Sequence, residues 1–441
     1  MDNDPILETR IRALESDLRK LSLENFVRAG GFYFKGDETY KGFNLLKNRQ
    51  PEELEISIAG SYKREVNLLL KNEIKKLCRI SDKNSWREFT HCSEKSSEFF
   101  YSWVELLGGF LIRDWGLDYT ICNIADNMIG LYAANTTKPW MGITLPSHDH
   151  ILRATLLRII RLPFQQWTLW TLPAVAHEYA HVLASESDTL HSYEPIRKAL
   201  IDFKEENIKR FEEHYGADDP INAKAKEWIE ELFSDIFATY VMGPAYACTA
   251  VMLILNPIQE INQTPTGIQR SIVIFKTLEN INFDSNYNEI IKNLEGKWDF
   301  TVKLANPVGW AQDPEEKRLL TDFSDRIFAF LENDGLSLSK YPPLDMIKWD
   351  RVRDLAEFMG NVLIGKGGSM QQNYYESYQL VDVLNAAWLC RMHRDSDQKE
   401  DNNQKAAAIK MQAMEICKKI IDAKSQIKVY TESGISKDPE V

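Results

Sequence analysis

The chain has 441 residues, of which 44% are hydrophobic and 27% charged, a composition typical of a globular protein with a sizeable core. Its formal net charge of -12 provides no overall basic field, which argues against nucleic acid as a partner. The six cysteines include no CxxC pair, and the first ten residues lack the basic-then-apolar order of a secretory signal. We therefore expect a cytoplasmic protein without a cysteine-based metal site.

Residues 5–25 have a helical pattern in which the apolar positions follow heptad spacing. These positions are Leu7, Ile11, Leu14, Leu18 and Leu21. The helix could pair two copies of the chain or bind a partner, or it could pack onto the body of the protein, because so short a coiled coil is marginal alone. We assign residues 1–28 to this helix and residues 29–117 to a second helical region.

The composition changes between residues 118 and 146. Segments 118–124, 128–134 and 140–145 are rich in β-branched and aromatic residues, and a turn-like stretch precedes the last of them. They predict a small sheet or hairpin.

Helical periodicity resumes near residue 150 and dominates to the end of the chain. The predicted fold class is therefore mainly α with a small β-sheet (α+β). We place a central core at residues 118–285 and a helical C-terminal region with a frayed tail at residues 286–441, so that helical regions flank the core.

Residues 236–255 contain no charged side chain over twenty positions, which is long enough to span a bilayer. Gly243 and Pro244 interrupt the segment in its middle. We interpret it as a buried core helix with a proline kink, and a transmembrane span is the alternative.

The motif HEYAH lies in an apolar run, residues 174–184, that follows Pro173 and predicts a buried helix. His177 and His181 are four residues apart, so both can face one metal ion from the same side of the helix. Glu178 follows the first histidine, where its carboxylate can accept a proton from a water activated by zinc. The pattern predicts a Zn2+ site for hydrolysis; a helix with two satisfied core histidines is the alternative.

A catalytic zinc normally has a third protein ligand. A metzincin would place glycine and histidine where this chain has Ala184 and Ser187, so that class is excluded. Asp188 and His191 lie just beyond the predicted helix and are candidates.

A better candidate lies about fifty residues further on, in a predicted helix with one apolar face. Glu231 and Asp235 are four residues apart on it, so one can bind the metal while the other orients a zinc-bound histidine. Glu227 and Glu230 are the nearest competitors, but an exposed acidic patch explains them better.

HEYAH followed by Glu231 and Asp235, in the form HExxH…ExxxD, resembles the thermolysin-like gluzincin group of zinc metallopeptidases. The resemblance covers residues 118–255 and implies a zincin-like catalytic core, with a strand beside the cleft for which 140–145 is the candidate. The residues it implies are the zinc ligands His177, His181 and Glu231, the general base Glu178, and Asp235 as the partner of a ligand histidine.

Zincins often add a side chain that hydrogen-bonds the oxyanion. Tyr246, just after the glycine–proline break, is our preferred candidate for this catalytic role, and a core tyrosine is the competing interpretation. The other candidates are Tyr240, His148, His150 and Arg270.

The sequence thus predicts a zinc-dependent peptidase that acts on a protein or peptide substrate, without nucleic-acid or membrane partners. The size of the helical flanks is compatible with an enzyme that stays latent until a partner or ligand opens its cleft. Two alternatives remain: a non-catalytic interaction or regulatory protein with a structural or vestigial zinc site, and a membrane-associated metalloprotease.

Overall fold

A computed structural model describes the chain from residue 87 onward, with gaps. The described residues are 87, 89–95, 101, 105, 108–109, 112–113, 120–133, 143–147, 159–163, 168–184, 194–207, 209, 221–258, 265–282, 287–305, 314–335, 349–363, 372–394 and 402–432. The heptad helix predicted at 5–25 lies outside them. The chain divides into two compact units, Met1–Cys122 with Met141–Phe164, and Asn123–Trp140 with Gln165–Val441.

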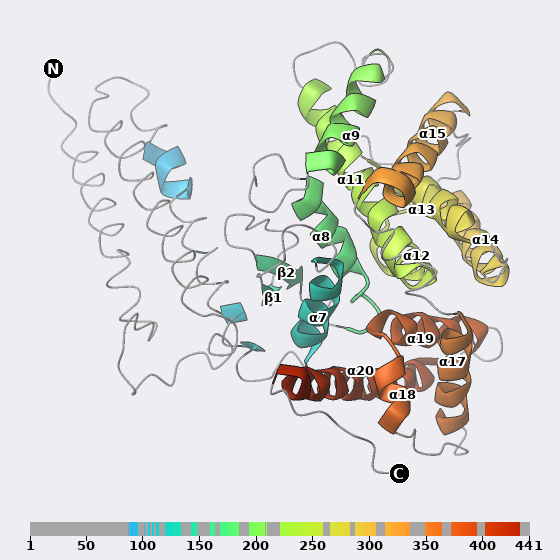
Figure 1. The fold of residues 1–441 in the computed structure, drawn as a ribbon. Helices are drawn as coiled ribbons and strands as arrows, with labels where there is room; N and C mark the ends of the chain where they lie inside the picture. Colours follow the sequence, from blue (N-terminus) through green and yellow to red (C-terminus); the bar gives the residue numbers. More distant parts are fainter. Residues whose placement is uncertain are drawn as a thin grey trace, which may run out of the picture. The chain divides into compact units, whose positions relative to one another are not determined.

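Helices make up almost all of the regular structure in the described residues, and a small sheet completes it (Figure 1). In chain order the longer elements are α7 (Ile121–Ala133), β1 (Ile143–Ser147), β2 (Ile159–Pro163), α8 (Ala174–Ala184), α9 (Glu194–Glu206), α11 (Ile221–Met242), α12 (Pro244–Thr249), the π-helical turn η4 (Ala250–Ile254), α13 (Gly267–Ile281), α14 (Asn288–Ala305), α15 (Pro314–Phe330), the π-helical turn η5 (Leu331–Gly335), α17 (Trp349–Leu363), α18 (Gln372–Ser377), α19 (Leu380–Arg394) and α20 (Asn402–Glu432). The prediction of a mainly helical protein with a small sheet is confirmed.

The sheet belongs to the first unit and consists of β1 and β2 in parallel, with Ile143 opposite Ile159 and Ser147 opposite Pro163. The Glu105 carboxylate joins the two strands, because it accepts a hydrogen bond from Ser147 on β1 at 2.6 Å and from Arg161 on β2 at 3.1 Å. The prediction of a hairpin is wrong, since a parallel pair cannot be closed by a tight turn.

The structure also differs from two local predictions of secondary structure. Segments 118–124 and 128–134 were both predicted as strands, but Ile121–Ala133 forms helix α7. Its buried positions recur at helical spacing, and packing of that face outweighs the strand preference of its β-branched residues. The buried apolar positions of α7 are Ile121, Cys122, Ile124, Ala125, Met128, Ile129, Tyr132 and Ala133. Helical periodicity predicted from residue 150 is likewise interrupted by β2, a short apolar run of the kind that periodicity alone cannot classify.

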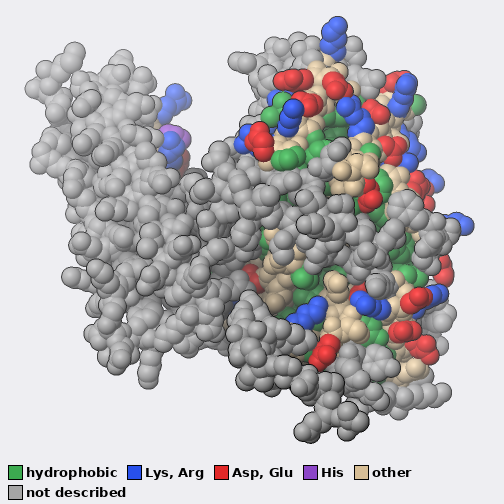
Figure 2. Space-filling view, viewed as in Figure 1, with side chains coloured by type: hydrophobic (Ala, Val, Ile, Leu, Met, Phe, Trp, Pro, Cys, Tyr) green, Lys and Arg blue, Asp and Glu red, His purple; other side chains and the backbone are tan. Residues whose placement is uncertain are grey.

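The second unit is a set of packed helix pairs: α8 lies against α11, α13 against α15, and α17 against α19. Aromatic side chains fill the interior between them; the ring of Phe323, for example, lies 4.6 Å from that of Phe203 and 6.1 Å from that of Trp228. On the described part of the face drawn in Figure 2, acidic and basic side chains are interspersed. The unit therefore combines an aromatic, apolar interior with charges of both signs on this part of its surface.

The uncharged segment 236–255 is divided between the end of α11, the short helix α12 and the π-helical turn η4. Helix α11 ends at Met242, Gly243 has φ 59° and ψ -142°, and α12 begins at Pro244. Every residue from Ile236 to Val251 is buried within the protein. Among the helices described, none is both long enough and apolar enough to cross a membrane.

Gly243→Ala should destabilise the protein, because the backbone conformation at this break is essentially restricted to glycine. We expect a loss of about 1–3 kcal/mol in the free energy of unfolding, measured by urea denaturation. Gly296→Ala is the matched control: a methyl group there meets nothing within 4 Å in the middle of α14, and the helix should gain about 0.5–1 kcal/mol. Equal effects at both positions would contradict the assignment of strain to the break.

Candidate metal centre

Helix α8 carries the HEYAH motif into the interior. A turn precedes it, in which the Thr168 carbonyl accepts hydrogen bonds from the amides of Thr171 and Leu172. Every residue of α8 is buried except Glu178, which is half-buried. Since successive helical residues are rotated by about 100°, Glu178 lies beside the face that carries His177 rather than on it.

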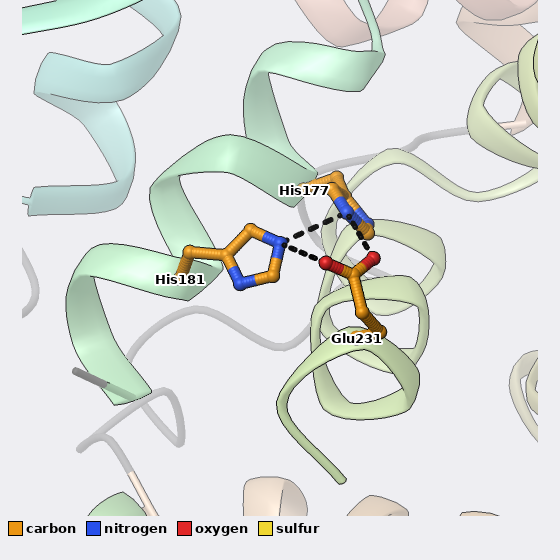
Figure 3. A group of neighbouring side chains, drawn as sticks. All are labelled: His177, His181 and Glu231. Carbon is orange, nitrogen blue, oxygen red and sulfur yellow. Dashed lines mark hydrogen bonds and ion pairs between the residues drawn. The ribbon is translucent and has the colours of Figure 1, made fainter. Parts of the chain in front are cut away.

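His177 and His181 converge with Glu231 of α11 at one point (Figure 3). The two Nε2 atoms lie 3.1 Å apart, and Glu231 places Oε2 at 3.4 Å from the first and Oε1 at 3.3 Å from the second. The structure therefore brings together the three residues that the sequence predicted as zinc ligands.

These separations fit a zinc ion. Zinc–nitrogen and zinc–oxygen bonds of about 2.0–2.2 Å in tetrahedral geometry place neighbouring donor atoms about 3.3–3.5 Å apart. The donor set of two imidazoles and a carboxylate is one that catalytic zinc sites use, and it leaves a fourth position for water. Two Nε2 atoms in mutual contact also need a cation or a proton between them, because two lone pairs repel.

The other nitrogen of His177 faces Asp235, four residues after Glu231 on α11. The distance from Nδ1 to Oδ1 is 3.1 Å, and the Asp235 side chain is 0% exposed. Tyr246 of α12 bridges the same two groups: its hydroxyl donates to Asp235 Oδ1 at 2.5 Å and lies 3.0 Å from His177 Nδ1.

This arrangement fixes the imidazole tautomer of His177. The charged carboxylate is the stronger acceptor, so it takes the tyrosine proton, and the tyrosine oxygen can then only accept from His177. Nδ1 therefore carries the hydrogen, which leaves the Nε2 lone pair directed at the metal position. Partners of this kind orient metal-bound histidines and raise their basicity.

Arg270 of α13 provides a positive charge beside the carboxylates of Asp235 and Glu231. Its Nε and Nη2 atoms donate to Asp235 at 2.7 and 2.8 Å, and its Nη1 lies 3.5 Å from Glu231 Oε2. Such a two-pronged guanidinium–carboxylate pair is the geometry that best compensates the removal of both charges from water.

The start of α13 explains how Arg270 reaches this place. Thr266 and Gln269 form a reciprocal capping box at the first turn of the helix. Gly267 lies so close to the Asn256 backbone that a Cβ would sit 2.2 Å from its carbonyl oxygen. The capped and closely packed first turn thus fixes the helix just before its arginine. Sequence reasoning named Arg270 only as an oxyanion donor, and the capping box was the available signal that a helix begins here.

The cluster favours a cation at the metal position, since two carboxylates face one guanidinium. Burial alone would lower the pKa of His177, but its interactions with Asp235 and Glu231 outweigh burial and raise that pKa to about 9. Burial likewise opposes ionisation of Glu231, yet its contacts with His177 and His181 hold its pKa far below the usual range. Without a metal ion, the two carboxylates therefore favour the protonated, positively charged form of His177.

The hydroxyl of Tyr246, which the sequence analysis preferred as the oxyanion donor, contacts Asp235 and His177. The Tyr246 side chain is buried, 1% exposed. The hydroxyl therefore helps to fix the orientation of the His177 ring. Tyr240 is directed elsewhere too, since its hydroxyl donates to Glu332 at 2.7 Å.

The structure describes two of the other candidates for the third ligand, Glu227 and Glu230. Glu227 is exposed, and Glu230 is buried near Lys226 at 3.8 Å, so the metal cluster contains neither. The remaining candidates lie outside the described residues: Asp188, His191, His148 and His150.

Comparison with known proteins adds no relationship: no protein-family model, no curated protein and no solved structure matches the chain. The geometry of the site itself therefore carries the functional interpretation.

Arg270→Met should strongly destabilise the metal-free protein, because it leaves the buried Asp235 carboxylate without its guanidinium. We expect a loss of about 3–5 kcal/mol in urea denaturation with a chelator present. Lys276→Met, on the same helix, removes an ion pair to Asp325 that is partly exposed, and should cost about 0–1 kcal/mol. Similar losses in the two variants would show that the buried Arg270–Asp235 pair contributes no more to the free energy of unfolding than a partly exposed pair.

Proposed function

We propose that this chain is a zinc-dependent peptidase of gluzincin type that hydrolyses peptide bonds in a protein or peptide substrate. The convergence of His177, His181 and Glu231 supports the proposal most directly, because α8 and α11 deliver donors of the right kind at zinc-compatible separations. The half-buried carboxylate of Glu178, next to the first ligand, is the second supporting feature.

When bound, zinc would lower the pKa of a water molecule and polarise the scissile carbonyl. The protein's own residues perform the remaining tasks. His177, His181 and Glu231 hold the ion, while Asp235 and Tyr246 keep the His177 ring in the orientation that directs Nε2 towards it.

Glu178 is assigned as the general base. Its carboxylate accepts a proton from the attacking water and can return it to the amine that leaves when the peptide bond breaks. Glu178 is only half-buried, so solvent reaches part of its side chain, whereas the Asp235 side chain is fully buried.

The number of protein ligands favours catalysis over a structural role. Structural zinc sites usually have four protein ligands, whereas catalytic sites have three and an open position. The cluster in the described residues contains three. A regulatory protein with a structural zinc site stays as the second candidate, and the two differ in what Glu178 does.

The zinc prediction concerns the purified protein and its ligand variants. We expect about one zinc ion per chain by elemental analysis, and loss of that ion in His177→Ala, because two donors hold zinc far less tightly than three. Glu227→Gln on α11 is the control: its side chain is exposed, and zinc content should not change. A wild-type chain that retains no zinc and takes up none on titration would refute the proposal.

Glu178→Gln separates catalysis from metal binding. This variant should keep its zinc and lose hydrolysis by about 100- to 10,000-fold, because the amide cannot accept the proton. The measurement is mass-spectrometric detection of new peptide termini after incubation with a proteome-derived peptide library. Equal cleavage by the two proteins would refute Glu178 as the general base. If both bind zinc and neither cleaves any peptide, a structural zinc site is the better interpretation.

A further inference from the structure

The break between α11 and α12 depends on a side chain from far along the sequence. Asn385 of α19 donates from Nδ2 to the carbonyl of Met242, the last residue of α11, at 2.9 Å. Its Oδ1 accepts from the amide of Ala245, in the first turn of α12, at 2.9 Å. Groups at helix ends have no partner within their helix, so one amide satisfies both sides of the break.

The side chain of Asn385 is buried, and a third hydrogen bond fixes it to its own helix. Its side chain is 2% exposed, and Nδ2 also donates to the carbonyl of Val381 on its own helix at 2.9 Å. The third bond fixes the amide to α19, so the relative placement of α11 and α12 follows the placement of α19.

The next residue after Ala245 is Tyr246, which bridges His177 and Asp235. Its ring lies nearly parallel to the imidazole of His177, at 13°, with the centroids 6.1 Å apart. A shift of the first turn of α12 would move this hydroxyl away from both partners, because Gly243 and Pro244 leave no continuous helix to hold it.

Helices α12 and α19 also both contact Trp170, in the turn before α8. Thr249, at the end of α12, donates to the carbonyl of Trp170 at 2.6 Å, in the turn before α8. Arg391 of α19 lies over the ring of Trp170 at 4.7 Å and over that of Trp388 at 5.0 Å. Helix α19 is therefore tied both to the start of α12 and to the segment that leads into HEYAH.

We infer that Asn385 is a positioning residue for the metal centre: it holds the α11–α12 break so that Tyr246 can orient His177. This inference rests on the proposed function, since it assumes that His177 binds a metal. It places α19 within the functional core, although the sequence analysis ended that core at residue 285.

Zinc affinity tests the inference, measured by competition with a chromophoric chelator. Asn385→Ala should weaken zinc binding about tenfold, within the range typical of groups that orient metal-bound histidines. Val383→Ala is the matched control, because its side chain is also buried on α19 but makes no hydrogen bond to the break. Its zinc affinity should stay within about twofold of the wild type even if its stability falls.

A double-mutant cycle identifies the route of the effect. If Asn385 acts through Tyr246, then Tyr246→Phe combined with Asn385→Ala should weaken zinc binding no more than Tyr246→Phe alone. Losses that multiply, or an Asn385→Ala affinity equal to that of Val383→Ala, would overturn the inference. A wild type without zinc would instead overturn the proposed function and this inference together, and a zinc-binding wild type without hydrolysis would overturn the function alone.

A measurement on the wild type covers the case in which Asn385→Ala does not fold. Coupling between sites is reciprocal, so zinc should slow amide hydrogen exchange in peptides from α12 and α19 as well as in α8 and α11. Peptides from α14 provide the reference. Protection confined to α8 and α11 would contradict the link through Asn385.

Discussion

The carboxylate of Asp235 imposes the strongest constraint on this structure, because it is ionised and withdrawn completely from water. A buried charge is tolerated only when hydrogen-bond donors surround it, and no single helix can provide them all. Here Tyr246 from α12 and Arg270 from α13 donate to it, and the imidazole of His177 from α8 places Nδ1 3.1 Å from the same carboxylate. The packing of these helices around α11 is therefore fixed by chemistry as well as by apolar contact.

One turn before Asp235, the same helix presents Glu231 to the two histidines. Helix α11 thus carries both the carboxylate proposed to bind zinc and the carboxylate that orients His177, at a spacing its own geometry sets. Arg270 contacts both, so the metal position, the histidine orientation and the start of α13 form one electrostatic unit. The same residues serve the packing of the helices and the proposed metal site. A substitution at Asp235 or Arg270 should therefore affect both stability and metal binding.

The helix break at Gly243 and Pro244 determines where the uncharged segment places Tyr246. A continuous helix would carry Tyr246 further along the axis of α11, whereas the break turns α12 so that the hydroxyl returns to Asp235. Its lack of charge follows from burial on all sides from Ile236 to Val251. The broken ends need partners in this apolar setting, and the amide of Asn385 supplies them.

The sequence by itself determined what depends on local geometry: mainly helical structure, and the paired positions of His177 with His181 and Glu231 with Asp235. A spacing of four residues on a helix specifies a shared face before any packing is known. Only the tertiary structure decided the parallel pairing of β1 with β2, the inward direction of Tyr246, and the contacts of Arg270 and Asn385. Those contacts join residues 35 to 143 positions apart, and they depend on how helices cross, which no local pattern encodes.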